Sequence, residues 1–158
     1  MGKNWDRHSN TVWDVANTVE PLGLVLAFLG VGRFASYDRF IGLVGFRLLV
    51  FGIFIRWTAI RTLGRLFTGV VTIKDDHPLI RHGLYRYVRH PSYTGALVAH
   101  LGLGLSFVSL VSLALSTIPF LIATTYRIRV EEHALRQKFG EAYVTYSEET
   151  WRLVPWFY

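Results

Sequence analysis

Apolar positions along the chain gather into four stretches separated by charged or polar segments. The first covers Val19–Phe34, with a glutamate near its start and an arginine near its end, and the second covers Phe40–Ile55 with a single charge at Arg47. The third and fourth lie within Ala96–Tyr126, which contains no Asp, Glu, Lys or Arg. A membrane-spanning helix needs roughly 20 apolar residues, or somewhat fewer where the bilayer thins. The pattern therefore predicts an all-α polytopic membrane protein with about four transmembrane helices.

The uncharged stretch Ala96–Tyr126 is too long to cross a membrane once. As a single helix rising about 1.5 Å per residue, it would be more than roughly 40 Å long. We therefore expect a hairpin of two short helices with its turn within Ser106–Ser112, and Pro119 as a kink that a membrane helix tolerates. Arg127–Phe139 keeps the helical period with one polar face, which predicts a C-terminal helix that continues past the membrane.

Basic residues are concentrated between the second and third apolar stretches and after the fourth. The positive-inside rule then places both termini and the connector 56–93 in the cytoplasm of a multi-pass protein. Within the connector, Val70–Ile73 is a short β-prone run and Lys74–Pro78 is typical of a turn. The rest of the connector is rich in arginine, histidine and tyrosine. Polar segments between membrane helices usually carry function, so we expect the active site on the cytoplasmic side.

The composition excludes several classes of function. The chain has 158 residues, of which 51% are hydrophobic, and it has no cysteine, which excludes disulfides, thiolate zinc sites and cysteine nucleophiles. The net charge is +6, but the arginines flank apolar stretches, which favours contact with anionic membrane lipids over nucleic-acid binding. His77 and His82 have no accompanying carboxylate set, so we expect no metal site. The polar start of the chain predicts no cleavable signal peptide.

A first cluster of candidate functional residues ends the connector. Gly83-Leu84-Tyr85 is followed by Arg89-His90-Pro91-Ser92-Tyr93 and Gly95. Pro91 disfavours helix at His90 and is suited to the first turn of the third membrane helix. His90 should therefore lie at the membrane edge beside unpaired helix-start N–H groups, which favour a carboxylate or another anion.

A second cluster follows the last apolar stretch. Arg127 and Glu131 are four residues apart, so they share one face of a helix. The arginine has the geometry to hold a carboxylate with two hydrogen bonds, and the glutamate to accept from an ammonium group. Together the two side chains match a zwitterion or two ligands of opposite charge.

These two motifs resemble those of the isoprenylcysteine carboxyl methyltransferase family, whose superfamily also holds phospholipid N-methyltransferases. The resemblance rests on the first cluster, on Arg127-x-x-x-Glu131-Glu132 and on Phe139-Gly140-Glu141-x-Tyr143, in this order about a helical hairpin. It implies S-adenosylmethionine as the cofactor, bound at the cytosolic face. By matching positions, the implied cofactor-binding residues are His77, Pro78, Leu79, Ile80, Tyr85, His90, Pro91, Ser92, Tyr93 and Glu131. The implied catalytic residues are Arg127, which would contact the substrate carboxylate, Glu131 and Arg89.

The length of the chain predicts one domain. We expect an integral membrane methyltransferase domain over residues 1–158, with membrane helices in 1–68 and a catalytic core in 69–158, the part that carries the resemblance. The expected partner is a lipophilic small molecule or a prenylated substrate from the bilayer, besides the membrane lipids themselves. A carboxylate acceptor is ionised at neutral pH and needs no base, which favours O-methylation. N-methylation of a phospholipid or other lipid amine, and a catalytically silent membrane scaffold, are the alternatives. The identity of the acceptor, the oligomeric state and the role of Arg47 stay open.

Overall fold

Helices make up most of the described chain. The computed structural model describes residues 7–33, 38–67 and 78–155. The long helices are α1 (Arg7–Phe28), α2 (Asp38–Leu63), α3 (Pro91–Ser106) and α4 (Leu110–Phe139). The shorter elements are the 3₁₀-helices η1 (Gly64–Leu66) and η2 (Gly83–Arg86) and the helix α5 (Glu141–Glu149). Among the described residues only two isolated β-bridges are present and no strand, so the predicted all-α fold is confirmed.

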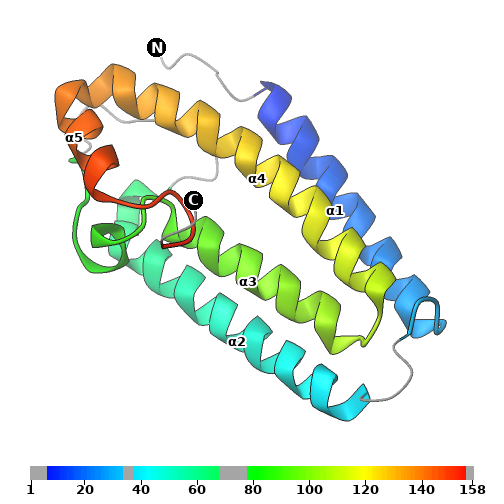
Figure 1. Ribbon diagram of the computed structural model, residues 1–158. Helices are drawn as coiled ribbons and strands as arrows, with labels where there is room; N and C mark the ends of the chain where they lie inside the picture. The colour runs from blue at the N-terminus through cyan, green and yellow to red at the C-terminus, as the bar shows by residue number, and fades with distance from the viewer. Residues whose placement is uncertain (1–6, 34–37, 68–77, 156–158) are drawn as a thin grey trace.

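The four long helices lie side by side with the predicted hairpin at their centre. The hairpin helices α3 and α4 pack on each other, α2 packs on the outer side of α3, and α1 packs along α4 (Figure 1). Helix α3 ends at Ser106 and α4 begins at Leu110, so the turn lies where the sequence placed it. Pro91 occupies the first turn of α3 and Pro119 lies inside α4, also as expected.

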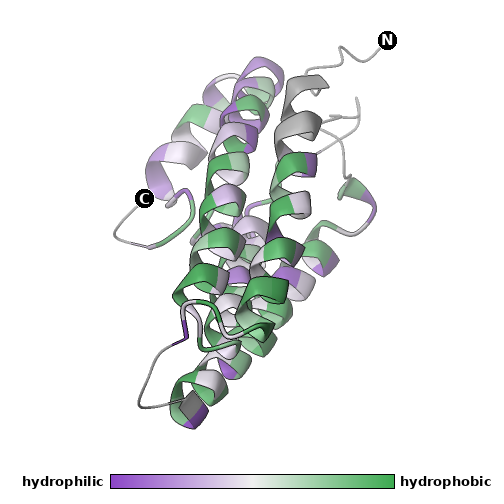
Figure 2. Cartoon of the chain, turned by 90° about the vertical axis from the view of Figure 1, so that its right-hand side faces the viewer, coloured by the Kyte–Doolittle hydropathy of each residue, from purple (hydrophilic) through white to green (hydrophobic). Residues whose placement is uncertain are grey.

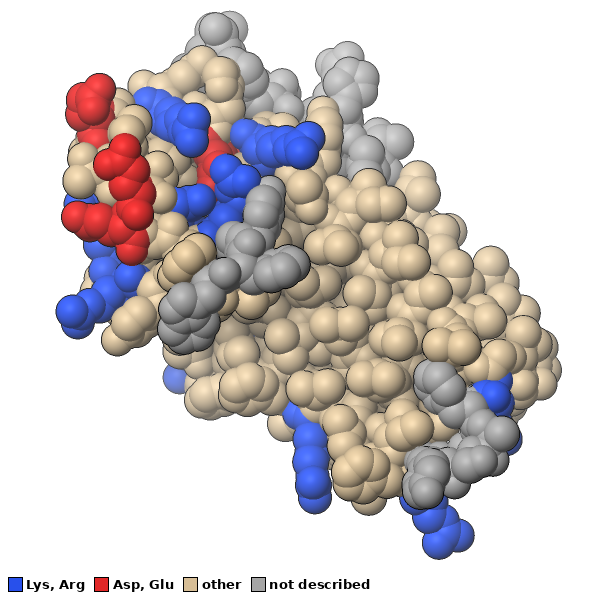
Figure 3. Space-filling view, viewed as in Figure 1, with Lys and Arg blue, Asp and Glu red and all other residues tan. Residues whose placement is uncertain are grey.

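Two of these helices are long and apolar enough to cross a membrane, namely the stretches Arg39–Leu66 and Leu110–Phe139. Apolar residues run along the length of the long helices, while hydrophilic residues collect toward one end (Figure 2). On the face shown in Figure 3, Lys, Arg, Asp and Glu gather at the end that carries α5, and the middle is almost free of charge. The large side chains Phe46, Phe51 and Phe54 of α2 are more than half exposed, as lipid-facing residues are. Crossing of the membrane by α1 and α3 stays a prediction.

Small residues bring α2 and α3 into backbone contact. A Cβ atom on Gly52 would lie 2.3 Å from the backbone nitrogen of Ala99, and one on Gly102 would lie 2.2 Å from that of Leu49. Only a residue without a side chain fits at such distances. Small residues at a helix interface are typical of membrane proteins, in which close van der Waals packing replaces the hydrophobic effect between helices.

The hairpin turn is fixed by the loop that follows α1. Ser109 caps α4 by accepting a hydrogen bond from the backbone N–H of Ser112 (3.2 Å), and its own hydroxyl donates to the carbonyl of Val31 (2.8 Å). The backbone N–H of Leu110 donates to the carbonyl of Gly32 (3.0 Å). These bonds pair the polar groups that a helix end would otherwise leave open.

At the opposite end, α4 continues beyond its apolar part as the sequence predicted. Gly140 has a positive φ of 52° and separates α4 from α5. After α5 the chain runs back beside η2 and the start of α3 (Figure 1). The β-prone run Val70–Ile73 and the expected turn Lys74–Pro78, apart from Pro78, lie outside the described residues.

Candidate active site

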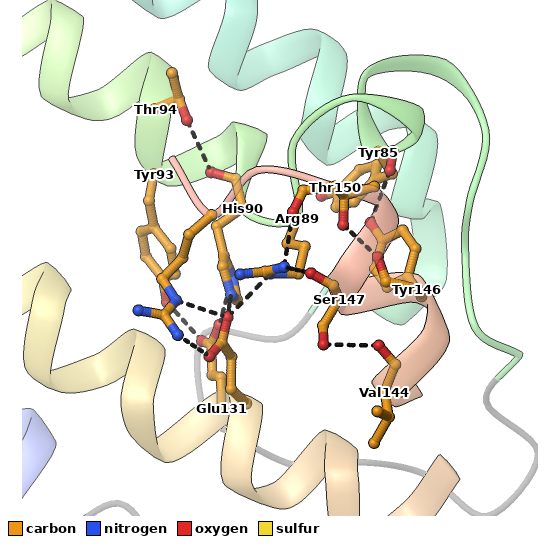
Figure 4. A network of polar contacts seen from close by, with 12 residues as sticks. Tyr85, Arg89, His90, Tyr93, Thr94, Glu131, Val144, Tyr146, Ser147 and Thr150 are labelled. Atoms are coloured by element: carbon orange, nitrogen blue, oxygen red, sulfur yellow. Dashed lines mark hydrogen bonds and ion pairs between the residues drawn. The ribbon is translucent and has the colours of Figure 1, made fainter. Parts of the chain in front are cut away.

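Three segments far apart in the sequence meet at the charged end of the molecule. They are the segment that leads into α3, the part of α4 that follows its apolar stretch, and the segment after α5. Their polar side chains converge on two neighbouring carboxylates, those of Glu131 and Glu132. Figure 4 shows the side chains of His90 and Tyr93 beside Glu131. Because adjacent helical residues point about 100° apart, the arginine partners of the two carboxylates differ, although both carboxylates contact His90.

The Glu131 carboxylate collects three residues that the sequence motifs had singled out. The Tyr93 hydroxyl donates to Glu131 Oε1 (2.5 Å), and Arg127 Nε lies 3.5 Å from the same oxygen, one helical turn away. His90 Nδ1 lies 3.6 Å from Glu131 Oε2. Arg127 is almost fully buried, whereas 24% of the Glu131 side chain is exposed. This carboxylate therefore keeps an open side that a ligand can reach.

The Glu132 carboxylate is more enclosed, with 7% of its side chain exposed. Arg89 Nε donates to Glu132 Oε1 (3.1 Å), and Arg152 contacts both carboxylate oxygens at 3.1 Å. Arg89 also donates through Nη1 to the carbonyl of Thr150 (2.7 Å) and to that of Ser147. Two guanidinium groups thus compensate one buried carboxylate and tie α4 to the segment after α5.

His90 lies between the two carboxylates. Its side chain is 6% exposed, and its Nε2 atom is 3.5 Å from Glu132 Oε1 with no hydrogen-bond partner within the described part of the chain. The expectation that Pro91 keeps His90 out of the helix is confirmed, since His90 is the N-cap of α3 with φ −123° and ψ 56°. The Nε2 atom thus lies beside the enclosed Glu132 carboxylate, and Nδ1 faces the partly open carboxylate of Glu131.

The backbone around His90 is held by the segment after α5. The N–H groups of Arg89 and His90 donate to the carbonyls of Trp151 (2.7 Å) and Arg152 (3.2 Å). The N–H of Trp151 donates in turn to the carbonyl of Tyr87 (3.0 Å), and the Thr94 hydroxyl donates to that of Leu153 (2.6 Å). We call residues 150–155 the C-terminal strap. The strap forms one wall of the candidate site.

A cluster of buried tyrosines packs behind this wall. The Tyr146 hydroxyl donates to the carbonyl of Tyr85 (2.7 Å), and the Tyr85 hydroxyl donates to the carbonyl of Ala59 (3.5 Å). Burial raises the pKa of Tyr146 to about 12 and also raises that of Tyr85. Both phenols therefore stay protonated at neutral pH and remain hydrogen-bond donors, which joins η2 to α5 and α2.

The predicted site residues lie in different surroundings. Tyr93, His90, Arg127 and Glu131 lie together, whereas the contacts of Arg89 are with Glu132 and the strap. Ser92 and Pro91 are buried at the start of α3, where Arg56 of α2 donates to Ser92 (3.4 Å). Pro78 is exposed, Leu79 and Ile80 are half-buried, and His77 lies outside the described residues. The assigned roles of all these residues stay predictions.

Sequence reasoning missed two residues that organise the site, Glu132 and Arg152. From the sequence, Glu132 stands out only as part of the family motif. Its place beside Glu131 was the one signal, because adjacent helical residues point about 100° apart and so have different surroundings. No local pattern marks Arg152, whose role depends on a contact with a residue 20 positions earlier.

A hollow of about 450 Å³ opens beside the strap, on the Arg89 side of the site. Its lining residues are Arg89, Ser147, Glu148, Glu149, Thr150, Trp151 and Arg152. Two arginines and a tryptophan among these residues give the hollow polar and aromatic walls.

Comparison with known proteins connects this geometry to one family. Residues 43–137 match the model of the isoprenylcysteine carboxyl methyltransferase family. A probable protein-S-isoprenylcysteine O-methyltransferase of Oryza sativa subsp. indica is 36% identical over 118 residues, or 73% of this chain and 62% of the relative. Protein-S-isoprenylcysteine O-methyltransferase A of Arabidopsis thaliana is 36% identical over 113 residues, or 70% of this chain and 57% of the relative. The chain thus spans about three fifths of the length of these relatives.

The fold is also similar to a solved structure, that of the eukaryotic intramembrane Ras methyltransferase, an isoprenylcysteine carboxyl methyltransferase. The TM-score is 0.74 with 23% sequence identity, over 91% of this chain and 52% of the other. Two helices of this chain are long and apolar enough to cross a membrane, in keeping with the intramembrane protein whose fold it shares. Because the family model covers the hairpin and the residues of both carboxylate clusters except those of the strap, the chain belongs to the isoprenylcysteine carboxyl methyltransferase family.

Proposed function

We propose that this protein is an S-adenosylmethionine-dependent methyltransferase that works at the membrane and methylates the carboxylate of an isoprenylcysteine-like or other lipophilic acceptor. One observation supports it most: Glu131, Tyr93, His90 and Arg127 meet at the charged end of apolar helices, in a chain of this family. An acceptor dissolved in the bilayer would reach such a site with its apolar part still in lipid.

The residues present fit the cofactor. The open side of Glu131 is an acceptor for an ammonium group or a neighbour for a sulfonium cation. The Tyr93 ring adds an aromatic face, which attracts cations. Bound S-adenosylmethionine would supply an electrophilic methyl group. The part of the implied cofactor site at His77 lies outside the described residues.

The protein's own part in the reaction is to position and desolvate the acceptor. A carboxylate is already ionised at neutral pH, so methyl transfer to its oxygen requires no proton to be removed. Arg127 would hold that carboxylate in line with the S–CH₃ bond, which breaks as the O–CH₃ bond forms. Because positive charge on sulfur and negative charge on oxygen both disappear, exclusion of water from the site favours the transition state over the separated ions.

N-methylation of a lipid amine is a second candidate, favoured by one observation. An amine acceptor must lose a proton, and His90 and Glu131 place an imidazole and a carboxylate within 3.6 Å of each other. The burial of Arg127 beside Glu131 favours the carboxylate acceptor instead, since a buried guanidinium would repel an ammonium group.

The proposal is tested by calorimetric titration of the purified protein with S-adenosylhomocysteine, in detergent and in lipid bilayers. Wild type should bind saturably, Glu131→Ala and His90→Ala should lose binding, and Glu141→Ala, which removes an exposed carboxylate of α5, should keep it. Methylation of N-acetyl-S-farnesylcysteine and of phosphatidylethanolamine by the binding-competent protein then separates the two acceptors. Failure of folded wild type to bind in either medium would overturn the proposal and favour a silent scaffold.

A further inference from the structure

Helix α1 presents one regular seam to the rest of the molecule. Its residues Trp13, Ala16, Glu20, Gly23 and Ala27 alternate in steps of three and four, the spacing that keeps one face of a helix against a partner. Ala16, Gly23 and Ala27 are buried, and a Cβ atom on Gly23 would lie 2.8 Å from Leu115 Cβ of α4. This helix precedes the segment 43–137 that matches the family model.

The seam contains one ionisable residue, Glu20, and it meets a histidine. Glu20 Oε1 lies 3.0 Å from His100 Nδ1 of α3, with 17% and 20% of the two side chains exposed. The His100 ring stacks on Phe120 of α4, with centroids 4.0 Å apart and planes at 23°. A half-buried polar pair in an apolar interface costs desolvation, and its best-attested role is to select one register between helices.

Two turns before Glu20, Trp13 lies against the acceptor side of the candidate site. Its ring is 6.3 Å from the Tyr93 ring and 5.4 Å from the Phe120 ring, centroid to centroid, and the Arg127 Cζ atom is 5.7 Å from its centre. Tyr93 and Arg127 are the two residues that contact Glu131 Oε1. Phe120 contacts both the Trp13 ring and the His100 ring. It therefore connects Trp13 to the Glu20–His100 pair.

We propose that α1 completes the acceptor site, with Trp13 as a positioning residue that acts through Arg127 and with the Glu20–His100 pair setting the register that brings Trp13 there. This inference rests on the proposed function, in which Arg127 holds the acceptor carboxylate. The indole face restrains the guanidinium plane and shields it from water, and a restrained, desolvated guanidinium binds a carboxylate more tightly.

The first test compares Trp13→Ala and Trp13→Phe with wild type. A cation–π contact is worth a factor of about 2 to 30 in binding, so Trp13→Ala should raise the KM for N-acetyl-S-farnesylcysteine within that range. Trp13→Phe should restore most of the loss, and S-adenosylhomocysteine affinity should change less than about twofold in both variants. The matched control is Trp57→Ala on α2, which removes a similar contact with Arg61 (3.8 Å) on another helix. An unchanged KM, or equal losses of cofactor and acceptor binding, would overturn the role of Trp13.

The second test reads the register of α1 without any activity. The chain has no cysteine, so an introduced pair is unique. Gly23→Cys with Leu115→Cys should form a disulfide after a shift of about 1 Å, whereas Ala27→Cys with Leu115→Cys is about 5.4 Å, one turn, out of register. Adding Glu20→Leu or His100→Leu should lower the yield of the first pair and raise that of the second.

An unchanged ratio of the two disulfides would overturn the part assigned to Glu20 and His100. These results separate the inference from the proposed function. If wild type neither binds S-adenosylhomocysteine nor methylates an acceptor, the proposed function and the role of Trp13 fail together, while the disulfide ratio still decides what sets the register.

Discussion

Glu131 and Glu132 are neighbours in sequence and opposites in setting. Glu131 contacts Tyr93, His90 and Arg127 and keeps a quarter of its side chain exposed, whereas Glu132 is nearly closed off between two arginines. The first arrangement leaves room for a ligand, and the second satisfies the carboxylate within the protein. We infer that the helix divides binding and architecture between consecutive residues, so substitutions at the two positions should fail in different ways.

The largest expected effect is that of Glu132→Ala on stability. Removal of one partner from a buried ion-pair cluster leaves Arg89 and Arg152 without their counter-ion, which typically costs about 3–5 kcal/mol. Thermal unfolding in detergent should show a much lower midpoint than wild type. Glu148→Ala, an exposed position on α5, is the control and should unfold like wild type. A normal midpoint for Glu132→Ala would mean that this carboxylate is not structural.

Glu131→Gln should reverse the emphasis, with a large loss of affinity and a smaller loss of stability than Glu132→Ala. The amide keeps the size of the side chain and one oxygen for Tyr93, but it loses the charge. Hydrogen bonds to charged groups contribute about 1.5–3 kcal/mol, so S-adenosylhomocysteine should bind about 10- to 100-fold more weakly. Calorimetry and thermal unfolding of the same sample measure both quantities. Wild-type affinity in this variant would remove Glu131 from the cofactor site.

Arg127, which contacts Glu131, and Arg152, which contacts Glu132, extend the comparison. Arg127→Ala should raise the KM for the acceptor. Arg152→Ala should have the lower midpoint of thermal unfolding of the two variants, because Arg152 bonds Glu132 through two nitrogens. Arg152→Ala should destabilise the protein by about 1.5–3 kcal/mol, the usual worth of hydrogen bonds between charged groups. Steady-state kinetics and thermal unfolding of both variants test this difference. Equal changes of KM and of unfolding midpoint in the two variants would refute it.

The smallest effect belongs to the strap itself. Thr94→Val deletes the hydroxyl that donates to Leu153 and leaves that carbonyl without this partner, at a cost of about 1 kcal/mol. Chemical denaturation should detect this loss, and Thr145→Val, an exposed position on α5, provides the control. Equal stability of the two variants would show that the strap is held by its backbone bonds alone.

The sequence predicted those parts of the molecule that depend on nearby residues. The hairpin turn follows from the length of the uncharged stretch, the start of α3 from Pro91, and the Arg127–Glu131 pair from helical spacing. These features involve residues within a few turns of each other, so period and spacing are enough to find them.

The resemblance placed His90, Tyr93 and Glu131 in one site, but other contacts between distant segments were not predicted. The enclosure of Glu132 needs Arg89, 43 residues before it, and Arg152, 20 residues after it. Trp13 reaches the site only because α1 packs along α4, and hydrophobic pattern alone does not say which helices become neighbours. Such contacts depend on which helices pack together, and the spacing of apolar residues along the chain does not determine that.

The C-terminal strap has a consequence for the order in which the protein matures. The His90 region emerges from the ribosome before its partners, since Leu153 is made 59 residues after Thr94. During synthesis the hairpin helices are therefore complete while the backbone around His90 still lacks the carbonyls that hold it. The site around His90 should therefore be completed only after the hairpin helices that carry it have been made.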